Sequence, residues 1–408
     1  MKKKFLAAAI GAMLVGGSAM AVEVAHGGKG DVLIAPMFMT GGGWVSEIKV
    51  INTNSTDSAV AKVVFHAADN SAELLDFLIY LTPGDVWVGT VSQNADGSVT
   101  MNSTDDSAVT VTDVNGCPTP TGTTGTTGIK ANFAAPYTLG YLNVFETRMF
   151  RGTVPTPYSK AALVKAYTDA CEAGVPITAA LTDNVLTGSV KMSNPQNGNV
   201  LALPMTALAN YDNTTYHSVG RYTGFFANAA TSNKAMVEDA IWSSDYVVPY
   251  NNATGQYTFA TITFPTKEAF YKSSAGSQYS VFPGTPSVGY VVRDEEERTL
   301  STSGCTVSPC PVTPPNSLPN ELNIVAISAG GTSSASTVGQ LFTETFTKGW
   351  VNVSPFAEIS DTKSRVGNNN FNVVGLPALA TYIQWNFNGS ALQGAWSYAS
   401  STFTPGNN

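Results

Sequence analysis

Charged residues are scarce in this chain. They make up 12% of its 408 residues, about half of the roughly 25% that is usual in globular proteins. Only three histidines occur, His26, His66 and His217, and no two of them have the i, i+4 spacing that places two imidazoles on one face of a helix. The sequence also lacks Cys-x-x-Cys, Gly-x-Ser-x-Gly and Gly-x-x-x-x-Gly-Lys motifs. We therefore predict no catalytic, cofactor-binding or metal-binding residue, no cofactor, and a protein that is not an enzyme.

Long apolar runs are also absent after residue 21, so we expect no membrane-spanning helix there. Residues 1–21 have the pattern of a signal peptide, with a basic start at Lys2–Lys4, an apolar stretch at Phe5–Val15 and small residues at Ala19–Ala21. Cleavage is expected before Val22. A short membrane anchor is the alternative, although the apolar stretch is well below the roughly 20 residues that span a bilayer.

The mature chain is predicted to be acidic and exported. Removal of the signal peptide takes away three of the 21 basic residues and none of the 29 acidic ones, so the formal charge changes from −8 to −11. A negative charge of this size argues against nucleic acid or anionic lipid as a partner. We expect the protein in the periplasm, at the cell surface or outside the cell, with no membrane span after signal cleavage.

Four cysteines are present, an even number, which in an exported protein favours disulfides over metal or redox chemistry. Four cysteines allow three pairings, and the sequence does not choose between them. We expect pairing of nearest neighbours, which would join Cys117 to Cys171 and Cys305 to Cys310.

The polar part of the composition is turn-forming rather than charged, with 37 Gly and 22 Pro. Short segments with two-residue alternation recur at a spacing near ten residues, as in Ala59–His66 and Leu74–Leu81. Clusters of Gly, Pro, Asn and Asp separate them, as expected for antiparallel connections. This pattern predicts a mainly β protein, either a sandwich or a barrel, and we favour an antiparallel sandwich, immunoglobulin-like or related.

Two segments interrupt the strand pattern. Residues 118–128 repeat Thr and Gly and predict an exposed, tethered loop. Residues 159–172 predict a helix with Ser159 as its N-cap and an apolar stripe of Leu163, Val164, Tyr167 and Cys171. A second helical piece is expected near residues 234–242. We divide the chain into a signal peptide (1–21), N-terminal sandwich strands (22–137) and a further β-rich region (138–408). That region contains the helix and is expected to be integrated with the first.

Few polar clusters suggest chemistry. The run Asp294–Glu297 is the sharpest concentration of charge, and a solvated turn with local arginine pairing is the favoured interpretation over an acid–base pair. The loops Thr104–Ser107 and Asp113–Gly116 carry oxygen ligands that suit calcium, but their spacing does not match a twelve-residue calcium loop. His66 ends an alternating strand and is expected at the surface or rim.

Aromatic residues offer the other candidate site, a platform on which sugars stack. Trp44, Trp87 and Trp350 lie in apolar runs and are expected in the core. Trp385 and Trp396 are the better surface candidates, with Asn386, Asn388 and Tyr398 nearby.

Several motifs resemble a family of exported bacterial β-rich surface proteins for which no activity is assigned. They are Gly30–Pro36, Leu74–Phe77 with Pro83–Trp87, Thr263–Lys267, Arg293–Glu296 and Leu318–Asn323. The resemblance spans most of the mature chain. It implies one integrated architecture and carries over no reaction or catalytic residue.

These observations favour a non-catalytic structural protein of the cell surface or extracellular space that self-assembles or adheres through its sheet edges. Val22–Val24, released by signal cleavage, is a candidate strand for donation to a neighbouring copy. The alternatives are a module that binds surface glycans or another extracellular ligand, an exported hydrolase, and an outer-membrane barrel, whose strands need roughly 9 to 11 residues.

Overall fold

The structure is a computed structural model. It describes residues 22–109, 111–114, 117–120, 128–151, 159–173, 183–211, 233–243, 246–251, 253, 256–267, 287–298, 316–326, 348–354, 376–388 and 391–399. The prediction of a mainly β, antiparallel fold with short helices is confirmed, because every strand pairing in these residues is antiparallel and two short α-helices accompany them. No helix in the described part of the chain has the length and apolarity needed to cross a membrane.

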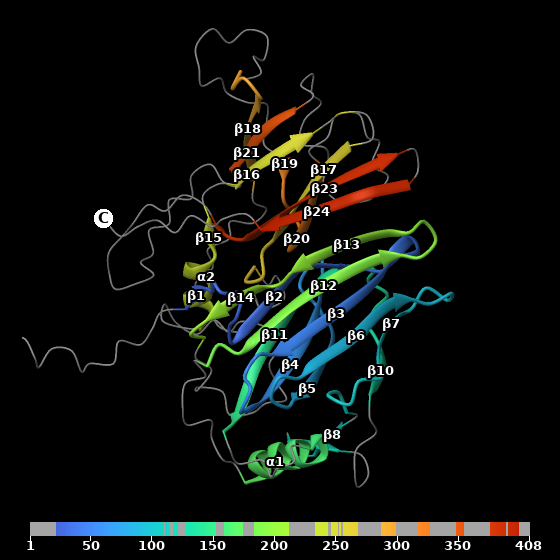
Figure 1. The fold of residues 1–408 in the computed structure, drawn as a ribbon, viewed down its shortest axis with the longest axis vertical. Helices are drawn as coiled ribbons and strands as arrows, with labels where there is room; N and C mark the ends of the chain where they lie inside the picture. Colours follow the sequence, from blue (N-terminus) through green and yellow to red (C-terminus); the bar gives the residue numbers. More distant parts are fainter. Residues whose placement is uncertain are drawn as a thin grey trace, which may run out of the picture.

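Two six-stranded sheets pack face to face in the lower half of Figure 1 and form a sandwich. The first sheet has the order β1 (Glu23–Val24), β14 (Thr206–Ala209), β2 (Val32–Met39), β11 (Leu139–Phe150), β4 (Ser58–Ala67) and β5 (Glu73–Leu81). The second sheet has the order β10 (Ile129–Asn132), β7 (Val99–Ser103), β6 (Val86–Gln93), β3 (Val45–Asn52), β12 (Leu186–Asn194) and β13 (Asn199–Pro204).

The upper half of Figure 1 holds two smaller sheets. The third sheet has the order β20 (Leu322–Ala326), β17 (Gln256–Thr263), β23 (Leu379–Asn388) and β24 (Ala391–Ala399), and the fourth has the order β16 (Tyr246–Asn251), β21 (Lys348–Ser354), β18 (Ser287–Asp294) and β19 (Asn316–Ser317). The remaining elements are η1 (Gly41–Gly43), α1 (Lys160–Glu172), α2 (Asn233–Ala240) and the strand pairs β8 (Val111–Val114) with β9 (Cys117–Pro120) and β15 (Trp242–Ser243) with β22 (Leu376–Pro377).

The central strands of the first sheet are buried on both faces. Every residue of β4 is buried, whereas burial alternates along β3 in the second sheet. The inner face of β4 packs into the main core between the sheets, and its outer face is covered by two smaller apolar clusters that include residues of α1 and α2. Each large apolar side chain that is fully buried in these cores contributes roughly 1.5–3 kcal/mol to folding.

The chain on either side of Tyr137 belongs to the same pair of sheets. β11 begins at Leu139 and lies between β2 and β4, and β12, β13 and β14 also join sheets that contain earlier strands. The position at which the sequence was divided is therefore a connection inside the sandwich. Of the Thr/Gly-rich segment predicted to be a loop, residues 118–120 continue β9 from Cys117, and residues 121–127 lie outside the described residues.

The third sheet contacts the sandwich through two hydrogen bonds and an aromatic pair. The Leu322 amide donates to the Ala68 carbonyl at 2.8 Å, and the Thr263 hydroxyl donates to the Pro36 carbonyl at 2.9 Å. Trp44 stacks on Trp385 with ring centroids 5.9 Å apart. These contacts attach the third sheet to one end of the sandwich.

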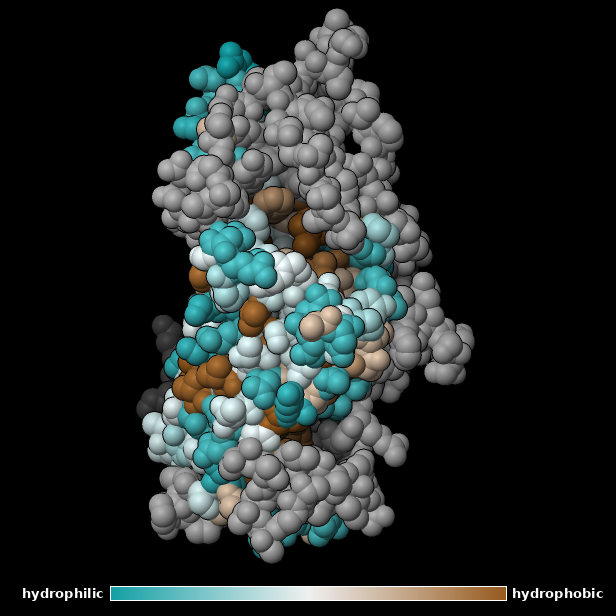
Figure 2. Space-filling model, turned by 90° about the vertical axis from the view of Figure 1, so that its right-hand side faces the viewer, coloured by the Kyte–Doolittle hydropathy of each residue, from teal (hydrophilic) through white to brown (hydrophobic). Residues whose placement is uncertain are grey.

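On the face shown in Figure 2, the described residues carry apolar side chains in separate groups with polar residues between them. Over the described residues as a whole, the exposed large apolar side chains are Val86, Val200 and Val247. Each lies on a different strand, β6, β13 or β16.

Candidate functional site

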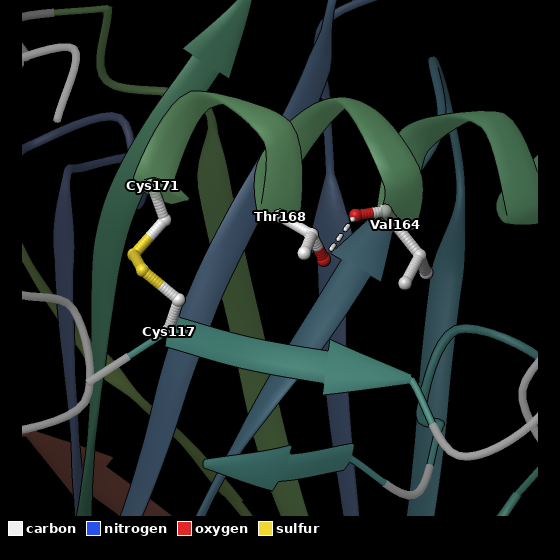
Figure 3. Close-up of a disulfide and its surroundings, with 4 residues drawn as sticks. All are labelled: Cys117, Val164, Thr168 and Cys171. Carbon is white, nitrogen blue, oxygen red and sulfur yellow. Dashed lines mark hydrogen bonds between the residues drawn. A yellow bond between two sulfur atoms is a disulfide. The ribbon is translucent and has the colours of Figure 1, made fainter. Parts of the chain in front are cut away.

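A disulfide joins helix α1 to the β8–β9 strand pair (Figure 3). It joins Cys117 of β9 to Cys171 near the end of α1, which confirms one of the two predicted pairs. Ser159 caps the helix as predicted, with its hydroxyl accepting a hydrogen bond from the Ala162 amide at 3.1 Å. Cys305 and Cys310, the second predicted pair, lie outside the described residues.

The buried face of α1 packs on β5. Leu163, Val164 and Tyr167 of the helix cluster with Val60 and Tyr80 of the first sheet. Their packing explains the apolar stripe in the sequence, and the disulfide closes a loop of 54 residues around it.

Lys160 fixes the beginning of the same helix. Its ammonium forms an ion pair with Asp85, and donates to the Ser107 hydroxyl at 2.7 Å and the Tyr80 carbonyl at 3.0 Å. Burial lowers the pKa of Lys160 to about 8. Its partners lie on β5, in the loop between β5 and β6, and in the loop after β7. This lysine therefore joins the helix to the sandwich.

His66 is buried in the first sheet, so the prediction of a surface or rim position is wrong. Its ring stacks on Tyr141 with centroids 4.8 Å apart. Nδ1 lies 3.1 Å from the Ser71 carbonyl and therefore donates, which leaves Nε2 to accept from the Asn143 amide at 3.3 Å. Burial lowers the pKa of His66 to about 4, so the ring is neutral at physiological pH and serves to hold the sheet.

Two carboxyl groups are buried where the first sheet meets the loop before β12. Asp31 is inaccessible to solvent and accepts hydrogen bonds from the amides of Asn184 at 2.8 Å and Tyr211 at 3.0 Å. Burial raises the pKa of Asp31 to about 7. The pKa of Glu146 is raised well above its usual range by burial and by the negative charge of Asp31 and Asp183. Through its two hydrogen bonds, the Asp31 carboxyl ties the start of β2 to the segments before β12 and after β14.

A buried lysine and two acids meet on the outer face of the first sheet. Lys62 of β4 forms an ion pair with Asp76 of β5, and Asp76 shares a hydrogen bond with Glu73 of the same strand. The side chain of Glu73 is exposed as a whole, but burial around its carboxyl group and the negative charge of Asp76 raise its pKa to about 7. The Lys62–Asp76–Glu73 group therefore combines a lysine, an aspartate and an acid that is partly protonated near neutral pH.

The sequence analysis did not single out this group, although a signal was present. Lys62 is the only charge in Ser58–Phe65, and Asp76 is the only charge in Leu74–Leu81. These two sequence segments each carry one charge, of opposite sign, and such segments on successive strands are candidates for a cross-strand pair. The sequence does not reveal that the lysine is buried.

The acidic run Asp294–Glu297 forms a turn after β18. Arg298 bonds to Asp294 through Nε at 2.6 Å and to Glu296 through a terminal nitrogen at 2.9 Å, while Glu295, Glu296 and Glu297 are exposed. The pKa of Asp294 is lowered, because hydrogen bonds from Arg298 and its positive charge outweigh burial. The arrangement is that of a solvated turn with local arginine pairing.

The first candidate calcium loop uses its oxygens internally. The Asp105 carboxylate accepts from the Ser107 amide at 2.8 Å and the Val88 amide at 3.3 Å. In the second loop, residues 115 and 116 lie outside the described residues. Within the ranges that the structure describes, no three His, Cys, Asp or Glu side chains come together in a way that could hold a metal ion.

The aromatic residues pack rather than forming an open platform. Trp87 is fully buried, as expected, but Trp44 and Trp350 are only half-buried. Trp385, which was expected at the surface, contacts two other rings. Its ring centroid is 5.9 Å from that of Trp44 and 5.4 Å from that of Phe259. The side chains of Trp396, Tyr398, Asn386 and Asn388 are outside the described residues.

A shallow depression of about 560 Å³ lies beside the β6–β7 turn. Its polar side chains are already engaged in that turn: Gln93 donates to the Gly97 carbonyl at 3.3 Å, and Asp96 accepts from the Ser98 hydroxyl at 2.6 Å. Phe133, which also lines the depression, is buried. This depression lacks a set of polar groups directed at a ligand.

The N-terminal segment of the described chain is paired within its own molecule. Glu23 and Val24 form β1 against Ala209 and Leu208 of β14, and Val22 is buried beside α2. The segment expected to be donated to a neighbour thus closes the edge of its own first sheet.

Taken together, the polar groups described above bind to strands, turns and helices of the same chain. Among them, the Lys62–Asp76–Glu73 group places a lysine and an aspartate in contact beside an acid whose pKa is raised. Comparisons with protein-family models, curated proteins and solved structures find no match for this chain.

Proposed function

We propose that the chain is an exported, non-catalytic structural protein of the cell surface or extracellular space that associates with copies of itself. The main support is the use to which its buried polar groups are put. Asp31, His66 and Lys160 each join separate segments of the sandwich, and the Cys117–Cys171 disulfide adds a covalent tie. Buried groups used in this way maintain a shape.

The proposed association takes place at the edge of the fourth sheet. β16 is the last strand of that sheet among the described strands, and Val247 on it is 56% exposed. Part of this edge is already bonded to the third sheet, because the Pro249 carbonyl accepts from the Gln384 side chain at 3.2 Å and the Asn251 amide donates to the Thr258 hydroxyl at 3.3 Å. The exposed apolar residue at the other end of the strand favours addition of a strand from a second copy there. Pro249 on the same strand lacks an amide donor and limits the length of that pairing.

Light scattering and electron microscopy of the purified mature protein test this proposal. We expect oligomers, filaments or lattices, and we expect Val247→Lys to reduce them, because a charged side chain on an edge opposes pairing. Val200→Lys is the matched control, since Val200 is also an exposed valine but lies on β13 of another sheet. A wild-type protein that stays monomeric at all concentrations would contradict association, and turnover in a hydrolase screen would contradict a purely structural role.

A further inference from the structure

The Lys62–Asp76–Glu73 group lies across two paired strands in a fixed register. Lys62 is opposite Leu78, and Asp76 is opposite Val64, so the lysine and the aspartate are diagonal neighbours on one face of the sheet. On the other side of β4, Lys62 is opposite Phe145 of β11. The pairing therefore holds the amine against the carboxyl group before any reaction takes place.

The lysine is in apolar surroundings. Its side chain is 2% exposed, and its cross-strand neighbours Phe145 and Leu78 are buried, as are Val60 and Val64 two residues away along β4. Removing an ammonium and a carboxylate from water is costly, even when they are paired. Proton transfer within the pair, or its conversion to a neutral amide, relieves that cost.

We propose that Lys62 and Asp76 form an intramolecular isopeptide bond, with Glu73 as the acid that relays the proton. The amide replaces two buried charges by one neutral group. Attack is favoured because the reacting groups are held in contact, which gives intramolecular reactions effective concentrations far above those of free solutes. This modification does not rest on the self-association proposed above.

The reaction balances without an oxidant or any other co-reactant. A proton moves from the Lys62 ammonium to the Asp76 carboxylate, and the neutral amine then attacks Cγ of Asp76. Glu73 gives its proton to the departing hydroxyl and takes one from the nitrogen, so it ends as it began. The new bond joins Nζ to Cγ, one C–O bond breaks, and one water leaves through the side on which Asp76 is 31% exposed.

The Lys160–Asp85 ion pair is an internal comparison. The side chain of Lys160 is 16% exposed and its ammonium also binds a hydroxyl and a backbone carbonyl. No acid with a raised pKa contacts Asp85 among the described residues. We expect this pair to stay unlinked, so the proposal assigns the bond to one lysine and not to buried ion pairs in general.

Mass spectrometry of the reduced and alkylated mature protein tests the proposal. Lys62 is the only lysine or arginine between Lys49 and Lys130, so an acylated Lys62 leaves residues 50–130 as one tryptic peptide. We expect this peptide with the mass of one water missing, and fragmentation that places the link between Lys62 and Asp76.

Glu73→Gln is the decisive variant, because the side chain is exposed and its replacement leaves the packing of β5 in place. We expect this variant to keep the wild-type circular dichroism spectrum, retain the water and be cleaved after Lys62. Lys160→Met is the control and should leave the link intact. A wild-type chain with its full mass that is cleaved after Lys62 would overturn the proposal, as would a link that maps to Lys160. A link that forms equally in Glu73→Gln would overturn the role given to Glu73.

Discussion

Removal of the Cys117–Cys171 disulfide should lower stability by an amount that follows from its position in the chain. The perturbation is the double variant Cys117→Ser with Cys171→Ser. The bond closes a loop across 54 residues, and loss of that constraint on the unfolded chain is worth about 4 kcal/mol. Leu163, Val164 and Tyr167 stay buried in the variant, so the helix is expected to remain docked and the effect to arise in the unfolded state.

Urea unfolding followed by tryptophan fluorescence measures this change, since Trp87 is fully buried and reports loss of the main core. Reduction of the wild-type protein breaks both expected disulfides, so it should lower the unfolding free energy by more than the double variant does. The predicted Cys305–Cys310 bond would close a far shorter loop, so its removal is the matched control, with an expected loss of roughly 2 kcal/mol. If the double variant unfolds at the wild-type midpoint, the loop-closure reasoning is refuted.

Two further predictions concern the buried interior. The pKa of Asp31 rises from 3.8 to about 7 on folding, so the folded state binds this proton more tightly than the unfolded state does. The unfolding free energy should therefore fall by about 4 kcal/mol as the pH rises from 3.8 to about 7. Asp31→Asn should remove this pH dependence of the unfolding free energy, which urea unfolding at a series of pH values measures. An unchanged pH dependence in the variant would contradict the raised pKa of Asp31. A methyl group at Gly89 would lie 2.5 Å from the Trp87 ring. Gly89→Ala should therefore lower the unfolding free energy by about 1–3 kcal/mol. This loss should be smaller in a Trp87→Leu background, and an equal loss there would show that the ring is not the obstacle.

Features that depend on neighbouring residues could be predicted from the sequence. Alternation predicted the strands near Ala59–His66 and Leu74–Leu81, and an N-cap followed by an apolar stripe predicted the helix that begins after Ser159. These signals are local, because the two-residue repeat of a strand and the capping of a helix are read within a few residues. The nearest-neighbour pairing of Cys117 with Cys171 rested on an expectation that the structure confirmed.

The tertiary structure alone decided strand order and burial. β11 joins β2 and β4 across about a hundred residues of chain, and α1 and α2 cover a sheet face that alternation leaves unspecified. His66 and Lys62 are polar residues whose burial depends on those distant segments. Contacts between residues far apart in sequence fix which face of a strand meets solvent. The pairing of Lys62 with Asp76 depends in addition on the register between β4 and β5, which the sequence does not specify.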